Sequence, residues 1–237
     1  TVTKLSYDRK KIISEVNWYR NIPNDIKLQT PRILESDLYG PKGASYEMER
    51  ILDPTLRELF LFLDRDPEMW TRIFTECHKT LRQMSHWKSD RSSASSLLTK
   101  TKSRVEEGGF MGSQTVQDFL WEFEQESKKY ETYSCLVHGD FCFSNLMWNN
   151  TENRITMLDP RGEIFYSPWY DWAKFRHSIL YGYDFVDSEL YSVSDLGVKM
   201  FDAGTEEIRN LYREVEREQF TEGEIRYLDL LTASLFL

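Results

Sequence analysis

Apolar and polar positions follow two different periods along the first fifty residues. Residues 1–5 are short and β-branched and indicate the end of a strand, whereas residues 8–21 place apolar side chains at helical spacing. Pro23 is expected to end that helix. Alternating stretches at 32–35 and 45–49 predict two further strands. The expected order in this region is therefore strand, helix, strand, strand.

Beyond residue 54 the pattern becomes mainly helical, with an interruption by short strands. Helices are expected at 55–63, 67–87 and 116–130, and the Ser- and Lys-rich segment 88–103 reads as an exposed connection into a further helix that ends at Gly108-Gly109. Short apolar strands are expected at 135–137, 145–148 and 155–158, with a hairpin turn at 149–153. Helices then return at 168–180, 190–201, 204–217 and 221–237. No internal repeat is visible.

Charge and composition narrow the class of protein. The chain has 237 residues, of which 30 are Lys or Arg and 39 are Asp or Glu, so the formal net charge is −9. An acidic chain repels phosphate backbones, which argues against a nucleic-acid partner. The three cysteines give no indication of a disulfide framework, and no apolar run is long enough for a signal peptide or a membrane span. We therefore expect a cytoplasmic globular protein without a membrane partner.

The stretch from His138 to Asp159 contains the most informative motif. It reads His-Gly-Asp-x-x-x-x-Asn, with Asp140 and Asn145 on one loop, followed by a hairpin and an apolar strand that ends in Asp159. The hairpin is expected to bring Asp159 beside Asn145. Phosphoryl transfer needs a carboxylate to accept the proton of an attacking hydroxyl, and hard oxygen ligands to hold Mg²⁺. The motif therefore predicts Asp140 as the catalytic base, Asn145 and Asp159 as Mg²⁺ ligands, and His138 as a structural residue of the loop.

The same residues also have a purely structural interpretation. A histidine can pack, and an aspartate or asparagine can cap a turn, so each residue alone is uninformative. The strand–loop–strand context at these offsets favours the functional interpretation.

The motif resembles the aminoglycoside phosphotransferase and choline kinase-like family of small-molecule kinases, whose hallmark is a His-Gly-Asp loop. Asp159-Pro160-Arg161-Gly162, Tyr170-Asp171-Trp172-Ala173-Lys174 and His177-Ser178 further resemble a bacterial subgroup from capsule and surface-polysaccharide gene clusters. The resemblance implies an α+β, bilobal, protein-kinase-like fold. Residues 1–49 would form an N-lobe remnant and residues 50–237 a mainly helical C-lobe. The implied activity is phosphorylation of a hydroxyl on a sugar, aminoglycoside or amino-alcohol, with ATP (or GTP) and Mg²⁺ as cofactors.

The same resemblance assigns nucleotide-binding residues in the N-lobe. Lys4, at a strand end, would contact the phosphates and pair with Glu15 on the next helix. The span Glu47, Met48 and Glu49 would lead into the hinge that binds adenine through its backbone. An exposed lysine, a solvated glutamate and a core methionine are the alternative interpretations. A Gly-rich phosphate loop would lie before residue 1.

Further residues are expected to support the loop or to contact the acceptor. Asp171 would hold the catalytic loop through backbone hydrogen bonds, with an ordinary helix cap as the alternative. Arg161, His177, Tyr183 and Asp184 would lie near the acceptor, although a packed histidine and a solvated aspartate fit the sequence as well. The acidic residues in this region favour a cationic acceptor, with a solvated face as the alternative: they are Glu163, Asp184, Asp187 and Glu189.

Three other functions account for parts of the sequence. A non-catalytic pseudokinase that binds nucleotide or a partner is favoured by the missing Gly-rich loop and disfavoured by the intact Asp140, Asn145 and Asp159. A protein kinase is disfavoured by the glycine of His-Gly-Asp and by the lack of an Ala-Pro-Glu element. A metal-dependent hydrolase would need a His-rich ligand spacing that the sequence lacks.

Overall fold

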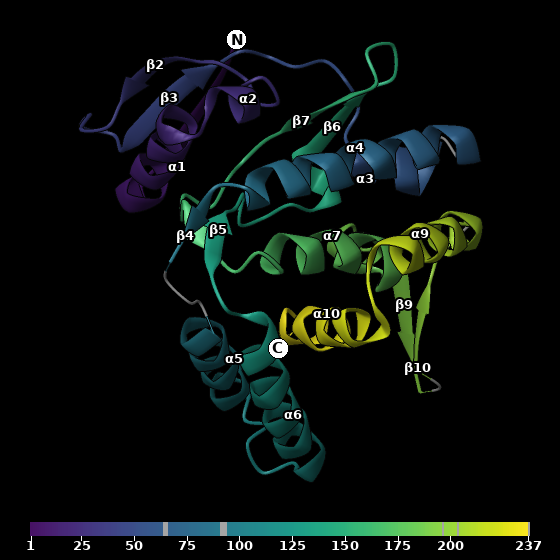
Figure 1. Cartoon of the computed structure of the whole chain (residues 1–237). Helices are drawn as coiled ribbons and strands as arrows, with labels where there is room; N and C mark the ends of the chain where they lie inside the picture. The colour runs from purple at the N-terminus through teal and green to yellow at the C-terminus, as the bar shows by residue number, and fades with distance from the viewer. Residues whose placement is uncertain (64–65, 91–93, 196, 203, 237) are drawn as a thin grey trace.

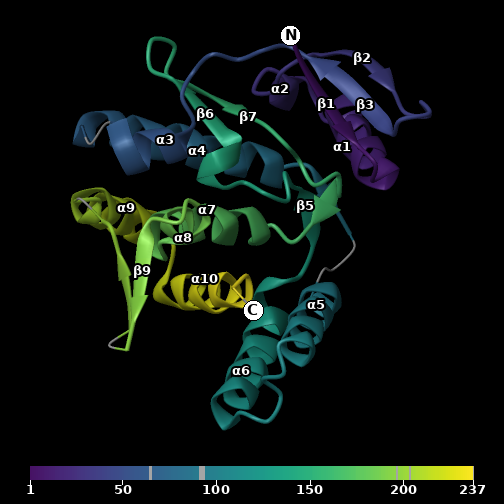
Figure 2. The ribbon, with the colours of Figure 1, turned by 180° about the vertical axis from the view of Figure 1, so that it is seen from behind.

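The computed structural model describes residues 1–63, 66–90, 94–195, 197–202 and 204–236. It has two parts, a small N-terminal sheet with helices against it and a larger, mainly helical part (Figure 1). A pair of helices, α5 (Ala94–Glu107) and α6 (Gln114–Tyr130), projects from the larger part at the end opposite the N-terminal sheet (Figures 1 and 2).

The N-terminal part has the expected order of strand, helix, strand and strand. An antiparallel sheet in the order β1-β3-β2 is formed by β1 (Val2–Ser6), β2 (Ile33–Asp37) and β3 (Ala44–Met48). Helix α1 (Arg9–Asn21) is capped by Asp8, whose side chain accepts a hydrogen bond from the backbone of Lys11. Pro23 does end α1, but it also begins the short helix α2 (Asn24–Lys27), which the sequence pattern did not indicate.

The next elements are helical, and one of them corrects the sequence prediction. A capped turn α3 (Leu56–Glu58) continues into a π-helix (Leu59–Leu63), and α4 (Pro67–Ser85) begins with Pro67 in its first turn. The predicted exposed connection at 88–103 is wrong beyond its first residues, because helix α5 already begins at Ala94. Its Leu97, Thr101 and Val105 are buried at four-residue spacing, and this sparse stripe is hidden among serines and lysines in the sequence. Residues 91–93 lie outside the described part.

The motif region consists of short strands, as expected. Strand β5 (Ser134–Leu136) pairs with β4 (Lys88–Ser89) and with β8 (Phe165–Tyr166), two strands that the sequence analysis missed. A short 3₁₀ turn (Phe143–Asn145) leads into the antiparallel hairpin of β6 (Leu146–Asn149) and β7 (Arg154–Met157).

The C-terminal part is helical except for one hairpin. Its helices are α7 (Tyr170–Leu180), α8 (Tyr183–Asp187), α9 (Glu206–Gln219) and α10 (Glu222–Ser234). The helix predicted at 190–201 is wrong: β9 (Tyr191–Ser194) and β10 (Gly197–Met200) form an antiparallel hairpin there. The β-branched and aromatic residues of this segment favour strands, and Gly197 has a φ of 119° that suits a hairpin turn. Residues 196, 203 and 237 lie outside the described part.

One hydrophobic core connects both parts and supports the motif loop. Helix α7 lies between α4 and α10 (Figures 1 and 2), and beneath the loop Phe143 packs edge-on against Phe60 at 5.3 Å and Phe175 at 5.6 Å. These rings are fully buried. Aromatic packing of this kind gives the loop a rigid base. Within the described residues, no helix has the length and apolar character needed to cross a membrane.

Candidate active site

The His-Gly-Asp segment forms a sharp loop directly after β5. Gly139 has a φ of 81°, and a Cβ placed on it would lie 3.0 Å from Cβ of Arg161. Glycine is the residue that fits this left-handed and crowded position. His138 is fully buried, and its Nδ1 accepts a hydrogen bond from the backbone of Asp140 at 3.3 Å. Burial lowers the pKa of His138 to about 4, so the ring is neutral at physiological pH and is held as a structural part of the loop.

Asp171, near the start of α7, holds this loop from below. Its buried carboxylate accepts hydrogen bonds from the backbone N–H groups of His138 at 2.6 Å and Gly139 at 2.9 Å. Burial raises the pKa of Asp171 to about 7, against the opposing effect of these two donors. The expected backbone hydrogen bonds are therefore present, and they determine the direction in which Asp140 points.

Asp140 is partly exposed and lies between two cations. Its Oδ1 is 3.0 Å from Nζ of Lys174 on α7 and 3.6 Å from Nη2 of Arg161. Burial by itself raises the pKa of Asp140, but Lys174 and Arg161 outweigh it and hold the pKa below its ordinary value. The carboxylate is therefore ionised at physiological pH. Sequence reasoning missed Lys174, although it lies in the Tyr170-Asp171-Trp172-Ala173-Lys174 segment, three residues after Asp171.

The β6–β7 hairpin brings Asn145 and Asp159 together as expected. Leu146 pairs with Met157 in the hairpin, and the next backbone N–H, that of Leu158, donates to the carbonyl of Asn145 at 2.8 Å. The side-chain amide of Asn145 donates to the carbonyl of Asp140 at 3.0 Å. Asp159 follows with a φ of 55°, a left-handed conformation that is uncommon for a residue with a side chain.

Lys4 of β1 links the two parts of the molecule across this loop. Its Nζ lies 2.9 Å from Glu15 and 3.0 Å from Asp159. Burial by itself lowers the pKa of Lys4, but the two carboxylates outweigh it and raise the pKa above its ordinary value. The predicted pairing of Lys4 with Glu15 is thus present in the structure, and Asp159 is a second partner of Lys4.

Two tyrosines extend this polar network, and sequence reasoning did not single them out. The hydroxyl of Tyr46 donates to Glu15 at 3.0 Å, and the hydroxyl of Tyr19 accepts from the backbone of Asp159 at 3.2 Å. Both rings are buried at the interface between α1 and the sheet. Their only signal in the sequence is a place on the inward face of a helix and of a strand, which any core tyrosine shares.

Asp140, Asn145 and Asp159 line one cleft of about 460 Å³ between the two parts, together with Lys4, Glu15 and Arg161. Asn145 and Asp159 offer two oxygen donors there, and Mg²⁺ in phosphoryl-transfer sites commonly takes one or two protein oxygens and completes its shell with phosphates and water. The described residues contain no group of three or more His, Cys, Asp and Glu that would bind a metal alone. The donor set fits a magnesium ion that arrives with a nucleotide. The lining residues are Lys4, Asp8, Lys10, Lys11, Ser14, Glu15, Asp140, Asn145, Asp159, Pro160 and Arg161.

The residues expected to lead into the hinge lie at the end of the central strand of the N-terminal sheet. Glu47 and Met48 lie in the central strand β3, which pairs with β1 on one side and β2 on the other. Backbone groups in such a strand face the neighbouring strands. The Glu49 N–H donates to the carbonyl of Arg32 at 3.0 Å, and the Glu49 carboxylate pairs with the Arg32 side chain. Met48 is therefore a core residue, and the chain leaves the sheet at Glu49.

Two residues expected near the acceptor are buried instead. Asp184 is fully buried, and its Oδ1 lies 2.6 Å from Nε of Arg57, which also pairs with Asp187 at 2.6 Å. His177 is buried and stacks on Tyr183 with ring centroids 4.1 Å apart; burial lowers the pKa of His177 to about 3. Asp184 and His177 are therefore packing residues, and Arg57 neutralises two of the four acids that were expected to attract a cationic acceptor.

This architecture defines a class of fold: a small N-terminal lobe with a lysine–glutamate pair, above a helical lobe whose central loop carries Asp, Asn and Asp. Comparison with solved structures assigns it. Aminoglycoside phosphotransferase APH(4)-Ia, in the apo form of a thermostable mutant, superposes with a TM-score of 0.59 and 14% identity, covering 98% of this chain and 76% of that one. The chain has the aminoglycoside phosphotransferase fold, and the predicted α+β, bilobal, kinase-like fold is confirmed.

Two other solved structures agree on the fold. Aminoglycoside phosphotransferase APH(3'')-Id from Streptomyces rimosus gives a TM-score of 0.58 and 12% identity over 97% of this chain and 85% of that one. Aminoglycoside-3'-phosphotransferase of type VIII gives 0.55 and 15% over 98% and 84%. Comparison of the sequence with protein-family models and with curated proteins finds no match.

Proposed function

We propose that this chain is an ATP- and Mg²⁺-dependent phosphotransferase that phosphorylates a hydroxyl of a small molecule. The observation that carries the proposal is the convergence of Asp140, Asn145 and Asp159 with the Lys4–Glu15 pair on one cleft. Support comes from the fold, because solved structures of similar architecture are described as complexes of APH(4)-Ia with AMP-PNP and hygromycin B and of APH(3'')-Id with ADP and streptomycin. We take residues 1–49 and 50–237 as the two lobes.

Each group in the cleft has a chemical role in this proposal. Asp140 is ionised and partly exposed, so it orients the acceptor hydroxyl and accepts its proton as the oxygen attacks the γ-phosphorus. Lys4, held by Glu15, provides positive charge for the nucleotide phosphates. Asn145 and Asp159 would hold Mg²⁺, which, when bound, neutralises charge on the phosphates.

The transfer is direct, without a phosphorylated enzyme intermediate. The new bond forms between the acceptor oxygen and the γ-phosphorus, while the bond from that phosphorus to the bridging oxygen of the diphosphate leaving group breaks. Cys142 is the cysteine of the catalytic loop, and it is buried with a pKa raised by burial to about 12, so it is not an activated nucleophile. The described side chains around Asp140 therefore position the reactants and supply charge.

A pseudokinase role is the second candidate function. A pseudokinase would bind nucleotide without turning it over. The Asp140→Asn variant decides between the two. Full-length protein with ATP and Mg²⁺ is assayed for phosphate transfer to sugars, aminoglycosides and amino-alcohols. We expect wild-type turnover, and a loss of kcat of at least about 100-fold in Asp140→Asn with little change in nucleotide binding.

Asp118→Asn on α6 is the matched control, because it makes the same chemical change on an exposed helix far from the cleft. Its kcat should equal that of the wild type. Wild-type protein that binds nucleotide in a thermal-shift assay but phosphorylates nothing, with Asp140→Asn indistinguishable from it, would support the pseudokinase role. Labelled phosphate appearing on protein instead of on small molecules would support a protein kinase.

A further inference from the structure

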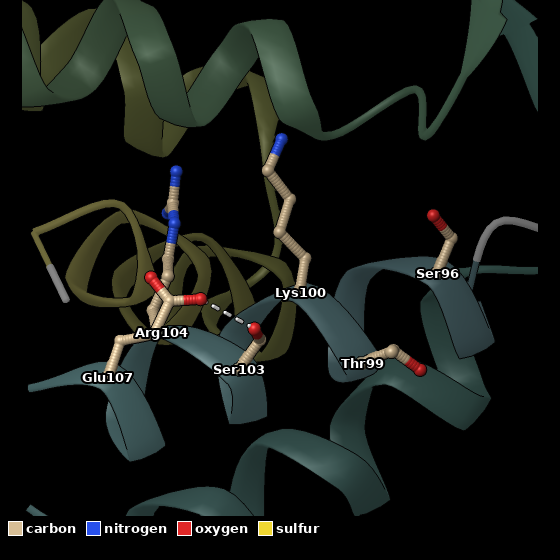
Figure 3. Close-up of a pocket in the computed structure, with 6 residues that line it drawn as sticks. All are labelled: Ser96, Thr99, Lys100, Ser103, Arg104 and Glu107. Carbon is tan, nitrogen blue, oxygen red and sulfur yellow. Dashed lines mark hydrogen bonds between the residues drawn. The ribbon is translucent and has the colours of Figure 1, made fainter. Parts of the chain in front are cut away.

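A second groove continues from the catalytic loop on the side away from the N-terminal sheet. Gly139, the residue before the proposed base, and Arg161 line it, together with Lys100 of α5 and Tyr170 of α7. Arg161 also lines the cleft that contains Asp140, so the two hollows share a wall. Lys100 in turn lines an adjoining open depression of about 590 Å³ on α5, with Arg104 one helical turn further along (Figure 3).

Two cations on α5, Lys100 and Arg104, form no ion pair within the described part of the chain. The third cation, Arg161, pairs with Asp140 at 3.6 Å, and the exposed Glu163 also lines the groove. In Figure 3 the side chains of Lys100 and Arg104 extend from one face of α5 toward the overlying ribbon. Among the described residues, neither has a carboxylate within ion-pair distance: Lys100 Nζ lies 5.3 Å from the ring centroid of Tyr170, and Arg104 donates to the carbonyl of Ser234 at 3.0 Å. The nearby acid Glu107 instead accepts a hydrogen bond from Ser103 at 2.8 Å.

Tyr170 adds an unused hydrogen-bond donor to the same groove. The residue is only 3% exposed, and its hydroxyl has no hydrogen-bond partner within the described part of the chain. Burial raises the pKa of Tyr170 to about 12, so the hydroxyl keeps its proton and can donate. A buried donor without a partner costs free energy that a ligand acceptor atom would recover.

Further cations lie near Lys100. The pKa of Lys100 is lowered by burial and by repulsion from Arg104, Arg161 and Lys174, while the exposed Glu163 opposes the effect only in part. This group of cations adjoins the proposed base, because two of its members, Arg161 and Lys174, pair with Asp140. A cationic acceptor would be repelled by it, and an anion would relieve the repulsion.

We propose that the acceptor carries an oxyanion, a phosphate or carboxylate group, which binds between Lys100, Arg104 and the hydroxyl of Tyr170 while its reacting hydroxyl reaches Asp140. The inference rests on the proposed phosphotransferase function and names its substrate class. It replaces the cationic acceptor expected from the acidic residues of the sequence, two of which are neutralised by Arg57. Arg161, which lines both hollows, lies on the path between the anion and the reacting hydroxyl.

The first test measures anion binding without turnover. The full chain is saturated with AMP-PNP and Mg²⁺, so that the nucleotide cleft is filled, and inorganic phosphate is titrated at constant ionic strength by calorimetry. We expect Lys100→Gln to weaken phosphate binding about tenfold, the effect of losing one charge-assisted hydrogen bond of about 1.4 kcal/mol. Lys102→Gln is the matched control, because Lys102 lies on the same helix but pairs with Glu124 of α6 at 3.4 Å. Its phosphate affinity should stay within about twofold of the wild type.

Acetate, titrated in the same way, distinguishes the two sources of the oxyanion. Tighter binding of phosphate than of acetate assigns a phosphate ester, and the reverse assigns a carboxylate.

The second test compares glucose, glucosamine, glucuronate and glucose 1-phosphate as acceptors. The inference is supported if an anionic sugar has a lower KM than the neutral and cationic sugars, and if that KM rises in Lys100→Gln.

The outcomes separate the inference from the proposed function. Phosphate that binds Lys100→Gln as well as it binds wild type, or that loses as much affinity in Lys102→Gln, overturns the oxyanion site even if the enzyme phosphorylates a neutral or cationic acceptor. Lys100-dependent phosphate binding without any phosphoryl transfer leaves the oxyanion site standing and rejects the phosphotransferase function.

Discussion

Replacement of Lys174 by methionine removes the cation closest to the proposed base and keeps most of the side-chain volume. Lys174 is 10% exposed at its side chain, and its Nζ lies 3.0 Å from Asp140, whereas Arg161 is more exposed and lies at 3.6 Å. Two unit charges 3.0 Å apart at an effective dielectric constant of about 20 attract by about 5.5 kcal/mol. If desolvation offsets three quarters of this energy, about 1.4 kcal/mol remains, which corresponds to about one pH unit.

The sign of the effect follows from the direction of the pKa shift. The pKa of Asp140 lies below its ordinary value in the folded protein, so the ionised base and its contribution to stability persist until the pH falls through that low value. Without Lys174, burial dominates and the pKa of Asp140 rises. The acidic limb of the profile of kcat/KM against pH should therefore move to higher pH by at least about one unit.

The assay is a pH profile of phosphoryl transfer for wild type, Lys174→Met and Lys174→Arg. The arginine variant keeps the charge and should keep the acidic limb near the wild-type position. Lys102→Met on α5 is a surface control that should change neither limb. A Lys174→Met enzyme with lower kcat but an unmoved acidic limb would refute the reasoning, because it would show that Lys174 only packs against the loop.

Two further predictions concern the loop that carries the site. Asp171→Ala leaves two buried backbone N–H groups of the catalytic loop without acceptors, so the free energy of unfolding in urea should fall by about 2 to 6 kcal/mol, and a loss below about 1 kcal/mol would contradict this role. Gly162→Ala forces a side chain into a φ of 84° and places a Cβ 2.7 Å from the carbonyl carbon of Ser14, so it should cost more than the about 1 to 2 kcal/mol of the backbone conformation alone. Gly109→Ala, with a φ of 73° and open space around it, should show only the backbone cost, and equal losses in the two variants would exclude a steric role for Gly162.

Sequence patterns predicted the structure correctly where the conformation depends on residues that are close together in the chain. The spacing of His138, Asp140 and Asn145, together with the apolar strands around them, placed the loop and the hairpin correctly, because a hairpin positions its two strand ends without help from distant residues. The order of strand, helix, strand and strand at the N-terminus was predictable for the same reason. The pairing of Lys4 with Glu15 followed from the resemblance to a kinase family, and the structure contains it.

Sequence periodicity gave the wrong secondary structure where few side chains are buried or where pairing between strands decides the conformation. Helix α5 buries only an occasional residue, such as Leu97 and Val105, so its polar surroundings hid it. The segment 190–201 carries apolar residues compatible with either a helix or strands, and the hairpin formed by β9 and β10 decides between them through cross-strand hydrogen bonds.

The charge of the site was decided only by tertiary contacts. In the sequence, Asp184 and Asp187 favoured a cationic acceptor. In the structure, Arg57 pairs with both of them, although it lies more than a hundred residues away in the chain. Lys174 of α7 pairs with Asp140, and Lys100 of α5 lines a groove beside Gly139, although nothing in their local sequence marks them. The sequence alone thus placed Asp140, Asn145 and Asp159 together, because a single loop and hairpin carry all three. The potential around them depends on distances between separate elements, and Coulomb energy depends on those distances and not on position along the chain.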